Sequence, residues 1–223
     1  MTQAVQPWRE ELARNRLRYP NERVVAFLSR LRKGRPDDDL EGLDVGFGHG
    51  RHVQAMMDVG IRASGIEIVD EAVAFARDHF AGAPLAGDWV VGDIDDGHFE
   101  PASFDVILEW GVAFLKPRDQ MVRHLAAVGE LLREDGRVLV NFRDVDSWLY
   151  GLGEEVGNDE FVLDERTGPY AGMHYTFLDR AGVERLIPEA GLEPLELERQ
   201  DLWLDGASQR HSWWVVEASR AKR

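Results

Sequence analysis

The residues best suited to chemistry begin with three glycines at alternate positions, Gly46, Gly48 and Gly50, which follow an apolar segment at 43–45. Glycine lets the backbone turn sharply and approach a ligand closely, because no side chain stands in the way. If a helix begins just after this loop, its first N–H groups are free to face the same ligand. The loop therefore predicts a site for a nucleotide-like ligand at the end of the first predicted strand.

The residue that follows the loop limits which ligand fits. A dinucleotide-binding loop needs a third glycine three residues after the second, and that position holds Arg51. A phosphate-binding P-loop needs a lysine after its glycines, and no lysine follows here. The pattern argues against NAD and nucleoside triphosphates, and it favours a ligand whose close contact carries no pyrophosphate.

With Asp44 before the glycines, the segment resembles the first motif of the class I S-adenosylmethionine-dependent methyltransferases, an acidic residue followed by Gly-x-Gly-x-Gly. Three further motifs continue the resemblance, in the family's order, over residues 40–142. The resemblance implies that Glu67 accepts hydrogen bonds from the ribose hydroxyls, that Asp93 meets the adenine amino group and that Ile94 packs on the adenine ring. Asp44 has an equal alternative role, which is to orient the loop through backbone hydrogen bonds.

The fourth motif, residues 104–110, would lie beside the methionine portion of S-adenosylmethionine. In related enzymes N-terminal helices close over the cofactor, so Arg18 or Tyr19 would meet the methionine carboxylate, with an ordinary helix start as the competing account. Phe47 and His49 depart from the residues common in the family, but the three glycines that let the backbone approach the ligand are kept. The resemblance thus implies this cofactor-binding set: Arg18, Tyr19, Asp44, Gly46, Phe47, Gly48, Gly50, Glu67, Ile68, Gly92, Asp93, Ile94, Glu109 and Trp110.

Two histidines are candidates for the general base that a hydroxyl acceptor needs near neutral pH. His174 ends a long loop and His211 opens the last predicted strand, and a structural role stays open for both. The remaining histidines lack the spacing of metal ligands, so no metal site is predicted. Surface or packing roles are expected for His49, His52, His79, His98 and His124.

Residues 143–176 show no sustained hydrophobic period and are rich in glycine. A loop this long inside a compact domain is usually a lid or a binding segment, so we expect it to cover the acceptor. Residues 173–178 and 211–216 are similar to stretches of small bacterial methyltransferases of the tellurite-resistance and general detoxification type. The aromatic residues of the loop could form a substrate wall, but such residues also close ordinary cores, and both roles stay open. The expected substrate residues are Arg143, Trp148, Tyr170 and Tyr175.

The elements that must hold these residues alternate between strand and helix, after a helical lead-in at 8–33 that Pro20 divides. Such alternation predicts an α/β, Rossmann-like fold, with a seven-stranded, mostly parallel sheet, helices on both faces and an antiparallel C-terminal strand pair. We expect a single domain: a helical cap at 1–36, a cofactor-binding core at 37–142, a substrate lid at 143–176, and the last helix and strands at 177–223. Strands are expected at 40–45, 61–66, 89–91, 104–108, 137–142, 192–199 and 211–218, and helices at 49–59, 70–80, 118–133 and 178–190.

Composition narrows the possible functions. The chain of 223 residues has no cysteine, which excludes disulfides, thiolate metal sites and thiol nucleophiles. Its net charge of −15 opposes general binding to nucleic acids and anionic membranes. No apolar run approaches the ~20 residues of a membrane span, and the start lacks the order of a secretory signal, so a cytoplasmic protein is expected.

The sequence therefore predicts an enzyme, a monomer or homodimer, that transfers a methyl group from S-adenosylmethionine to a small-molecule acceptor. Two other readings stay open. One is a non-catalytic sensor or scaffold that binds S-adenosylmethionine, and the other is an NAD-dependent oxidoreductase.

Overall fold

The computed structural model describes residues 2–14 and 16–221, so residues 1, 15, 222 and 223 of the predicted terminal segments lie outside the described residues. Its elements, in chain order, are α1 (Thr2–Arg14), α2 (Glu22–Gly34), β1 (Glu41–Val45), α3 (Arg51–Asp58), β2 (Arg62–Glu67), α4 (Asp70–His79), β3 (Ala86–Val91), η1 (Ile94–Asp96), β4 (Phe104–Glu109), η2 (Ala113–Leu115), α5 (Arg118–Leu131), β5 (Leu132–Asp144), β6 (Gly153–Gly157), β7 (Glu160–Leu163), η3 (Glu165–Tyr170), β8 (His174–Leu178), α6 (Arg180–Glu189), β9 (Leu192–Leu204) and β10 (Gln209–Arg220).

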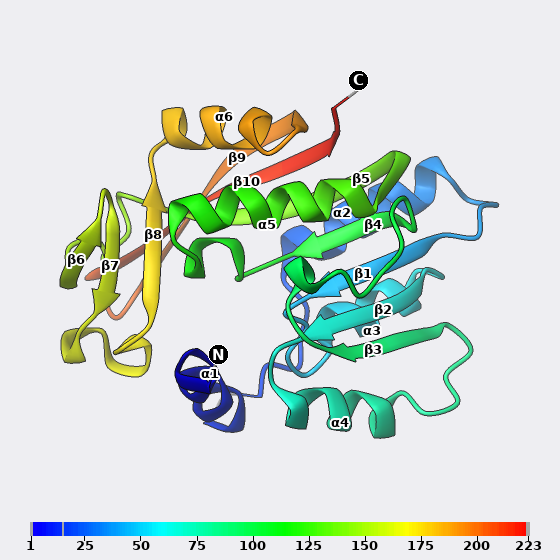
Figure 1. Ribbon diagram of the computed structural model, residues 1–223, viewed down its shortest axis with the longest axis horizontal. Coiled ribbons are helices and arrows are strands. Elements are labelled where there is room, and N and C mark those ends of the chain that lie inside the picture. The colour runs from blue at the N-terminus through cyan, green and yellow to red at the C-terminus, as the bar shows by residue number, and fades with distance from the viewer. Residues whose placement is uncertain (1, 15, 222–223) are drawn as a thin grey trace.

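Ten strands form the sheet (Figure 1). Strands β3, β2, β1, β4 and β5 are parallel neighbours in that order, and β10 and then β9 continue the sheet as an antiparallel pair beside β5. These seven strands are the predicted sheet. Because β1, β2, β3 and β4 all run the same way, their carboxyl ends meet at one edge, where ligands of open α/β sheets bind.

Helices cover both faces of the sheet. Buried apolar residues of α5 and α6 pack with one face, and those of α2, α3 and α4 pack with the other. The central strands β1 and β2 are buried over most of their length, and every residue of β4 is buried, as expected when helices cover both sides of a parallel sheet. The helix α1 lies apart from both layers, facing the carboxyl edge of the parallel strands (Figure 1).

The segment 143–176 is more regular than its sequence predicts. It contains β6, β7, η3 and most of β8, and the antiparallel strands β6, β7 and β8 lengthen the sheet beyond β5. The prediction of an irregular loop was therefore wrong. Strands of only four or five residues, such as β7 and β6, carry too few alternations to stand out between glycines.

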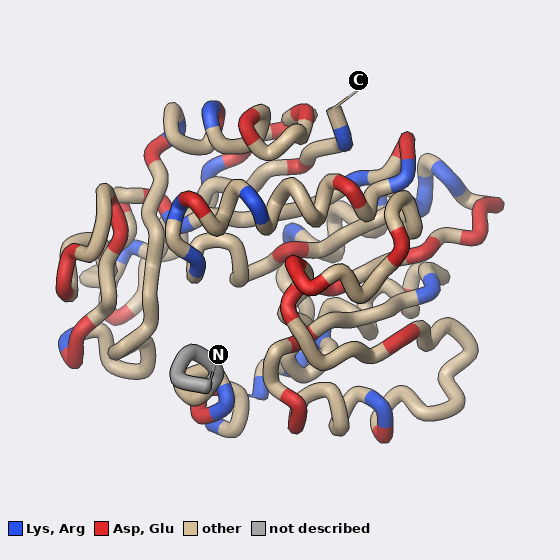
Figure 2. Tube along the Cα trace, viewed as in Figure 1, with Lys and Arg blue, Asp and Glu red and all other residues tan. Residues whose placement is uncertain are grey.

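Acidic positions occur on the helices, in the loops and on the strands at both ends of the sheet, with basic positions among them (Figure 2). Among the described helices, none has the length and apolar character that crossing a membrane requires.

Candidate active site

A cavity of about 470 Å³ lies at the carboxyl edge of the parallel strands, within the range of roughly 300–1,000 Å³ that small-molecule pockets occupy. Its floor is formed by residues that end β1, β2 and β3 or directly follow them. Residues Trp8 and Leu12 of α1 close it from the opposite side. The other walls come from the ends of β4 and β8 and from α5: Gly111, Val112, Leu115, Lys116, Pro117, Gln120, His124 and His174.

The glycine loop and Glu67 form one hydrogen-bonded unit at the centre of this floor. The Glu67 carboxylate accepts the Gly48 N–H at 3.0 Å and the Val69 N–H at 3.1 Å. Gly48 has a φ of +56°, and a Cβ atom there would lie on the cavity side, 3.2 Å from Leu12 Cδ2. Burial raises the pKa of Glu67, and the backbone N–H bonds partly offset this. The loop is thereby fixed with its backbone toward the cavity, and Glu67 keeps acceptor lone pairs free.

Asp44 lies beneath the loop as an acid without a full set of partners. It is 2% exposed, and its Oδ2 has no hydrogen-bond partner among the described residues. Burial raises its pKa well above the usual range, while Arg51 acts in the opposite direction. A buried polar atom without a partner costs about 1–3 kcal/mol. A positively charged ligand group beside the loop would lower that cost.

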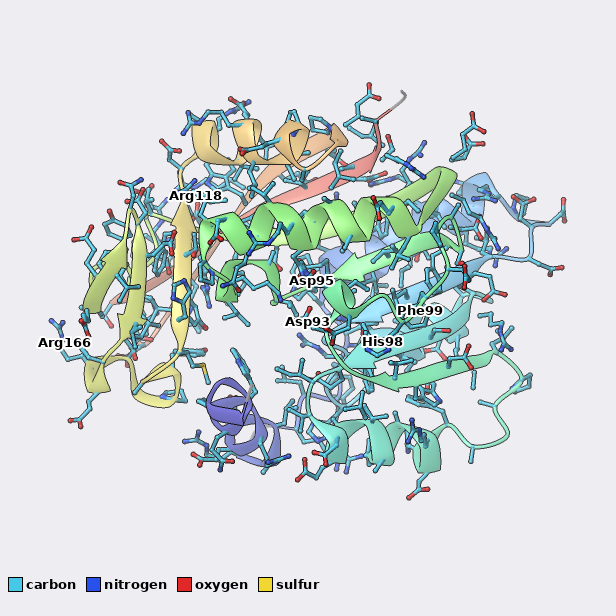
Figure 3. The ribbon with its side chains drawn as sticks, in the orientation of Figure 1. Asp93, Asp95, His98, Phe99, Arg118 and Arg166 are labelled. Atoms are coloured by element: carbon cyan, nitrogen blue, oxygen red, sulfur yellow. The ribbon has the colours of Figure 1, made fainter. Side chains whose placement is uncertain are left out.

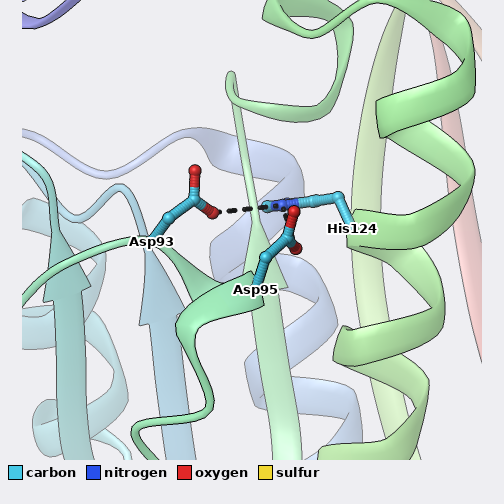
Figure 4. A group of neighbouring side chains, drawn as sticks. All are labelled: Asp93, Asp95 and His124. Atoms are coloured by element: carbon cyan, nitrogen blue, oxygen red, sulfur yellow. Dashed lines mark ion pairs between the residues drawn. The ribbon is translucent and has the colours of Figure 1, made fainter. Parts of the chain in front are cut away.

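At the next strand end, the half-buried Asp93 belongs to a network centred on the buried His124 of α5 (Figure 4). His124 Nε2 lies 3.0 Å from Glu109 Oε1, and its Nδ1 lies 3.7 Å from Asp93 Oδ1 and 3.6 Å from Asp95 Oδ1. Lys116 Nζ lies 2.6 Å from Asp93 Oδ2. Asp93 and Asp95 lie below the start of α5, where Arg118 approaches β8, and His98 and Phe99 lie farther along the same loop (Figure 3).

The network fixes the charge of its members. Burial lowers the pKa of His124, but the neighbouring carboxylates of Asp93, Asp95 and Glu109 outweigh burial and raise it to about 10. Burial raises the pKa of Asp93, but the cations His124 and Lys116 outweigh burial and hold this pKa well below its usual range. Near pH 7, therefore, Asp93 is a carboxylate and His124 an imidazolium, so Asp93 can accept a hydrogen bond but His124 cannot act as a base.

The same side chains resemble a metal site in composition. One ligand atom each of Asp93, Asp95 and His124 lies within 4.8 Å of the others. The positive charge that a metal ion would bring is already supplied by Lys116 and by the His124 imidazolium. Cations of the chain thus balance these carboxylates.

The cavity brings together half of the residues that the sequence assigns to the cofactor: Gly46, Gly48, Glu67, Ile68, Gly92, Asp93 and Ile94. Several others lie behind its walls. Phe47 packs edge-on against Trp89, and a Cβ at Gly50 would meet the Phe80 ring at 2.7 Å. Glu109 is 0% exposed and paired with His124. These residues shape the site from outside.

Trp110, Arg18 and Tyr19 also lie off the cavity. Trp110 packs against the apolar core on the α2 side of the sheet and edge-on to His52. Arg18 is exposed, and the Tyr19 side chain is 84% exposed. The chain ahead of α2 contributes to the cavity through Trp8 and Leu12 of α1 instead, which the sequence placed only in a helical lead-in.

His174 reaches the cavity from β8. The Thr176 hydroxyl donates its hydrogen to the Lys116 carbonyl at 2.7 Å, so it can only accept from His174 Nε2, 3.2 Å away. Nε2 therefore carries the proton of the neutral ring, and Nδ1 is the nitrogen that can accept one. Burial lowers the pKa of His174, against the effect of Glu160, so the imidazole is neutral at pH 7.

His211 lies on β10, away from the cavity lining. Its Nε2 accepts the Trp148 indole N–H at 3.0 Å, and burial and Arg143 lower its pKa to about 4. Its lone pair is thus already used. Arg143, Tyr170 and Tyr175 lie with Trp148 in or beside an apolar cluster next to Phe114, outside the cavity lining.

Of the cavity residues that the sequence did not assign, His124 is the clearest. It was expected at the surface or in packing, and it is instead 0% exposed and paired with carboxylates. Its spacing from Met121, Leu125 and Val128 places it on the apolar face of α5. Burial of His124 could have been inferred from this spacing. Lys116 and Gln120 carried no comparable signal.

Comparison with known proteins places this geometry in a family. Residues 43–136 match the model of a methyltransferase domain. A ubiquinone biosynthesis O-methyltransferase of Thiobacillus denitrificans is 31% identical over 160 residues, which are 70% of this chain and 65% of that protein. One of Mesorhizobium japonicum is 27% identical over 186 residues, 75% of this chain and 73% of that protein. The chain thus spans slightly less than two thirds of the first relative.

This chain contains a class I S-adenosylmethionine-dependent methyltransferase domain. Solved structures agree with that fold. The Burkholderia thailandensis 1,6-didemethyltoxoflavin-N1-methyltransferase, with its substrate and S-adenosylhomocysteine bound, has a TM-score of 0.70 at 18% identity, covering 97% of this chain and 87% of that one. A methyltransferase of Methanosarcina mazei has a TM-score of 0.70 at 16% identity, covering 84% and 95%.

The methyltransferase domain fits its cofactor by its own geometry. Glu67 has acceptor lone pairs facing a cavity, Asp44 has an oxygen without a partner beneath the loop, and Gly48 leaves open the space that a side chain would fill. A ribose diol, a cationic group and a close backbone contact each have a counterpart there.

Proposed function

We propose that this chain binds S-adenosylmethionine in the cavity under α1 and transfers its methyl group to a hydroxyl oxygen of a small molecule. The observation that carries the proposal is the buried Glu67 carboxylate, held by two loop N–H groups at the cavity floor, with a second fixed carboxylate, Asp93, at the neighbouring strand end. Two acids so placed can recognise the ribose hydroxyls and the adenine amino group of one adenosine.

The remaining contacts follow from the walls. Ile68 and Ile94 supply apolar surface for the adenine ring, and Gly46 and Gly48 allow the methionine portion to approach the backbone. Asp44 lies behind the glycine loop, and its carboxyl group would attract the positively charged ammonium group of the cofactor across that loop. Arg18, Tyr19 and Trp110 are not part of this proposed set.

S-adenosylmethionine supplies a methyl group activated by its sulfonium charge. The chain's task is to hold the acceptor oxygen in line with that methyl group and to exclude water. Trp8, Leu12, Val112 and Leu115 give the cavity apolar walls, which help to exclude water.

His174 is the proposed general base. Its Nδ1 accepts the hydroxyl proton as the oxygen forms its bond to the methyl carbon, and the bond from that carbon to sulfur breaks, leaving S-adenosylhomocysteine and a methyl ether. The lowered pKa of His174 keeps the ring neutral and ready at pH 7. His211 is a weaker candidate because its acceptor nitrogen already binds Trp148.

Residues 143–176 are proposed to cover the acceptor. In support, β8 pairs with the last two residues of β5, at the edge of the sheet where the cavity lies. The first residue of β8, His174, lines the cavity. Trp148 and Tyr170 pack in the apolar cluster of this segment together with Trp8, which also lines the cavity. The ubiquinone-pathway relatives favour an oxygen acceptor. The net charge of −15 favours a small-molecule partner over nucleic acid or an anionic membrane. A cytoplasmic location and a monomer or homodimer are part of the proposal.

Calorimetry with S-adenosylmethionine and S-adenosylhomocysteine, followed by turnover of methyl-labelled cofactor against a panel of hydroxylated metabolites, tests the proposal. Heat of binding at one site and label in the organic product support it. Absence of heat and of a melting shift with both compounds would refute it. Binding without transfer to any acceptor would favour a sensor or scaffold, and a melting shift with NADH alone would favour an oxidoreductase.

A further inference from the structure

Arg143, near the carboxyl end of β5, is a buried cation without a counter-ion. It is 5% exposed, and its Nε and Nη1 are buried with no hydrogen-bond partner among the described residues. None of the ion pairs found in the described part of the chain includes it. Arg23, which is 9% exposed, makes the contrast: it lies 3.1 Å from a Glu196 carboxylate oxygen and 2.5 Å from one of Glu198.

Aromatic rings surround the Arg143 guanidinium. Its central carbon lies 4.5 Å from the centroid of the Trp213 ring, 5.6 Å from that of Phe114 and 5.8 Å from that of Tyr175. Cation–π contacts contribute roughly 0.5–2 kcal/mol each, but they leave the donors on Nε and Nη1 without a hydrogen-bond partner among the described residues. We call these three rings and the guanidinium the Arg143 cage.

Burying an ion without a partner costs several kcal/mol. Burial accordingly lowers the pKa of Arg143, and the Tyr175 and Tyr170 phenols act against this. Arginine nevertheless stays charged. Replacing it by an apolar side chain would relieve the cost, so its presence among aromatic rings points to a negative charge that arrives with a ligand.

The Arg143 cage shares its wall with the cavity. Phe114 directly precedes Leu115, and Tyr175 directly follows His174, and both of these neighbours line the cavity. Trp8 lines the cavity and also packs in the apolar cluster that contains Phe114 and Tyr175. The cage therefore lies directly behind the part of the cavity wall that Leu115, His174 and Trp8 form.

We infer that the acceptor is a small, flat carboxylate, whose anionic group binds Arg143 while the aromatic rings pack on its body. The inference rests on the proposed methyl transfer for the identity of the ligand as an acceptor. Arginine presents N–H groups in a planar fork that matches a carboxylate. Because the guanidinium is closed to solvent, the ligand must displace cage side chains as it enters.

Pairs of probes that differ only in charge test this inference: 2-, 3- and 4-hydroxybenzoate against their methyl esters, titrated at neutral pH with and without S-adenosylhomocysteine and read by tryptophan fluorescence. At least one acid should bind the wild type about tenfold tighter than its ester, roughly 1.4 kcal/mol. Arg143→Met should abolish that preference while leaving ester binding unchanged. Arg143→Lys, which keeps the charge but not the fork, should retain part of it.

The melting temperature separates a ligand-binding arginine from a structural one. Arg143→Met should melt at or above the wild-type temperature, because an unpaired buried charge is removed. Arg166→Met, an exposed arginine of the same segment that pairs with Asp164, is the matched control and should keep the preference for the acid.

Equal affinity for acid and ester, no binding of any acid at millimolar concentration, or a large loss of melting temperature in Arg143→Met would overturn the inference. These readouts do not use methyl transfer. Retained acid binding without transfer would therefore count against the proposed function alone.

Discussion

The proposed cofactor half of the site, residues 43–94, and the proposed acceptor half, residues 111–178 together with Trp213 of β10, are built differently. In the first, the backbone of the glycine loop and the acids Glu67 and Asp93 define the cavity floor, and both of these acids have fixed partners. In the second, side chains from η2, β5, β8 and β10 meet, and the cation Arg143 has none. A ligand common to many relatives can be held by backbone geometry, whereas a ligand particular to one enzyme is selected by side chains.

The largest expected effect is loss of cofactor binding in Gly48→Val, by about a hundredfold or more, roughly 2.8 kcal/mol. A branched side chain at a φ of +56° is strained, and it would occupy the cavity beside Leu12. Calorimetry with S-adenosylhomocysteine measures the loss, and circular dichroism checks the fold. Gly82→Val, at a φ of +77° with open space around it, suffers similar strain and should bind normally. Retained affinity in Gly48→Val would mean that the loop is merely structural.

A smaller loss is expected from Glu67→Ala, which removes charge-assisted hydrogen bonds worth about 1.5–3 kcal/mol. Affinity for S-adenosylmethionine should fall roughly 10- to 150-fold. Glu130→Ala on the exposed side of α5 is the control and should bind as the wild type does. If Glu67→Ala bound equally well, the ribose would have to lie elsewhere.

Changes in the acceptor half should separate the two halves. Trp148→Ala, Tyr170→Ala and His174→Gln should each reduce turnover of an acceptor, while cofactor affinity changes by less than about tenfold, roughly 1.4 kcal/mol. His174→Gln should also remove the acidic limb of the pH–rate profile, because no base remains to be deprotonated. Normal turnover in all three variants would mean that this segment does not bind the acceptor, and the N-terminal helices would become the better candidate.

The His124 network gives a pH-dependent effect on stability. Its folded-state pKa is raised from 6.5 to about 10, so its contribution is fully present below about pH 6.5 and is lost as the pH rises through 10. The difference in unfolding free energy between wild type and His124→Gln should therefore shrink between pH 6.5 and pH 10. Urea unfolding across that range measures it, and a constant difference would show that His124 is neutral when folded.

The smallest effect is expected from Tyr19→Ala. This side chain is 84% exposed and does not line the cavity, so cofactor affinity should stay within about twofold, roughly 0.4 kcal/mol. A tenfold loss of cofactor affinity would show that the segment before α2 does contact the cofactor.

The sequence predicts the cofactor half better because its signals are local. The mostly parallel sheet and the C-terminal antiparallel pair were confirmed. Gly48, Glu67 and Asp93 stand at strand ends, and parallel strands bring their ends together. No local pattern announces that Trp8 closes the cavity, that Glu109 pairs with His124, or that Arg143 lacks a counter-ion, because each depends on elements distant in the chain.

The attachment of β8 has a consequence for how such enzymes diversify. Only two register pairs, Arg143 with Phe177 and Asp144 with Leu178, join β8 to β5, while β7 pairs with β8 and β6 with β7. In the sheet, the segment is therefore joined to the parallel strands along one short stretch of backbone. We expect an exchange of residues 145–176 between homologues to change the acceptor that is methylated and to leave cofactor binding intact.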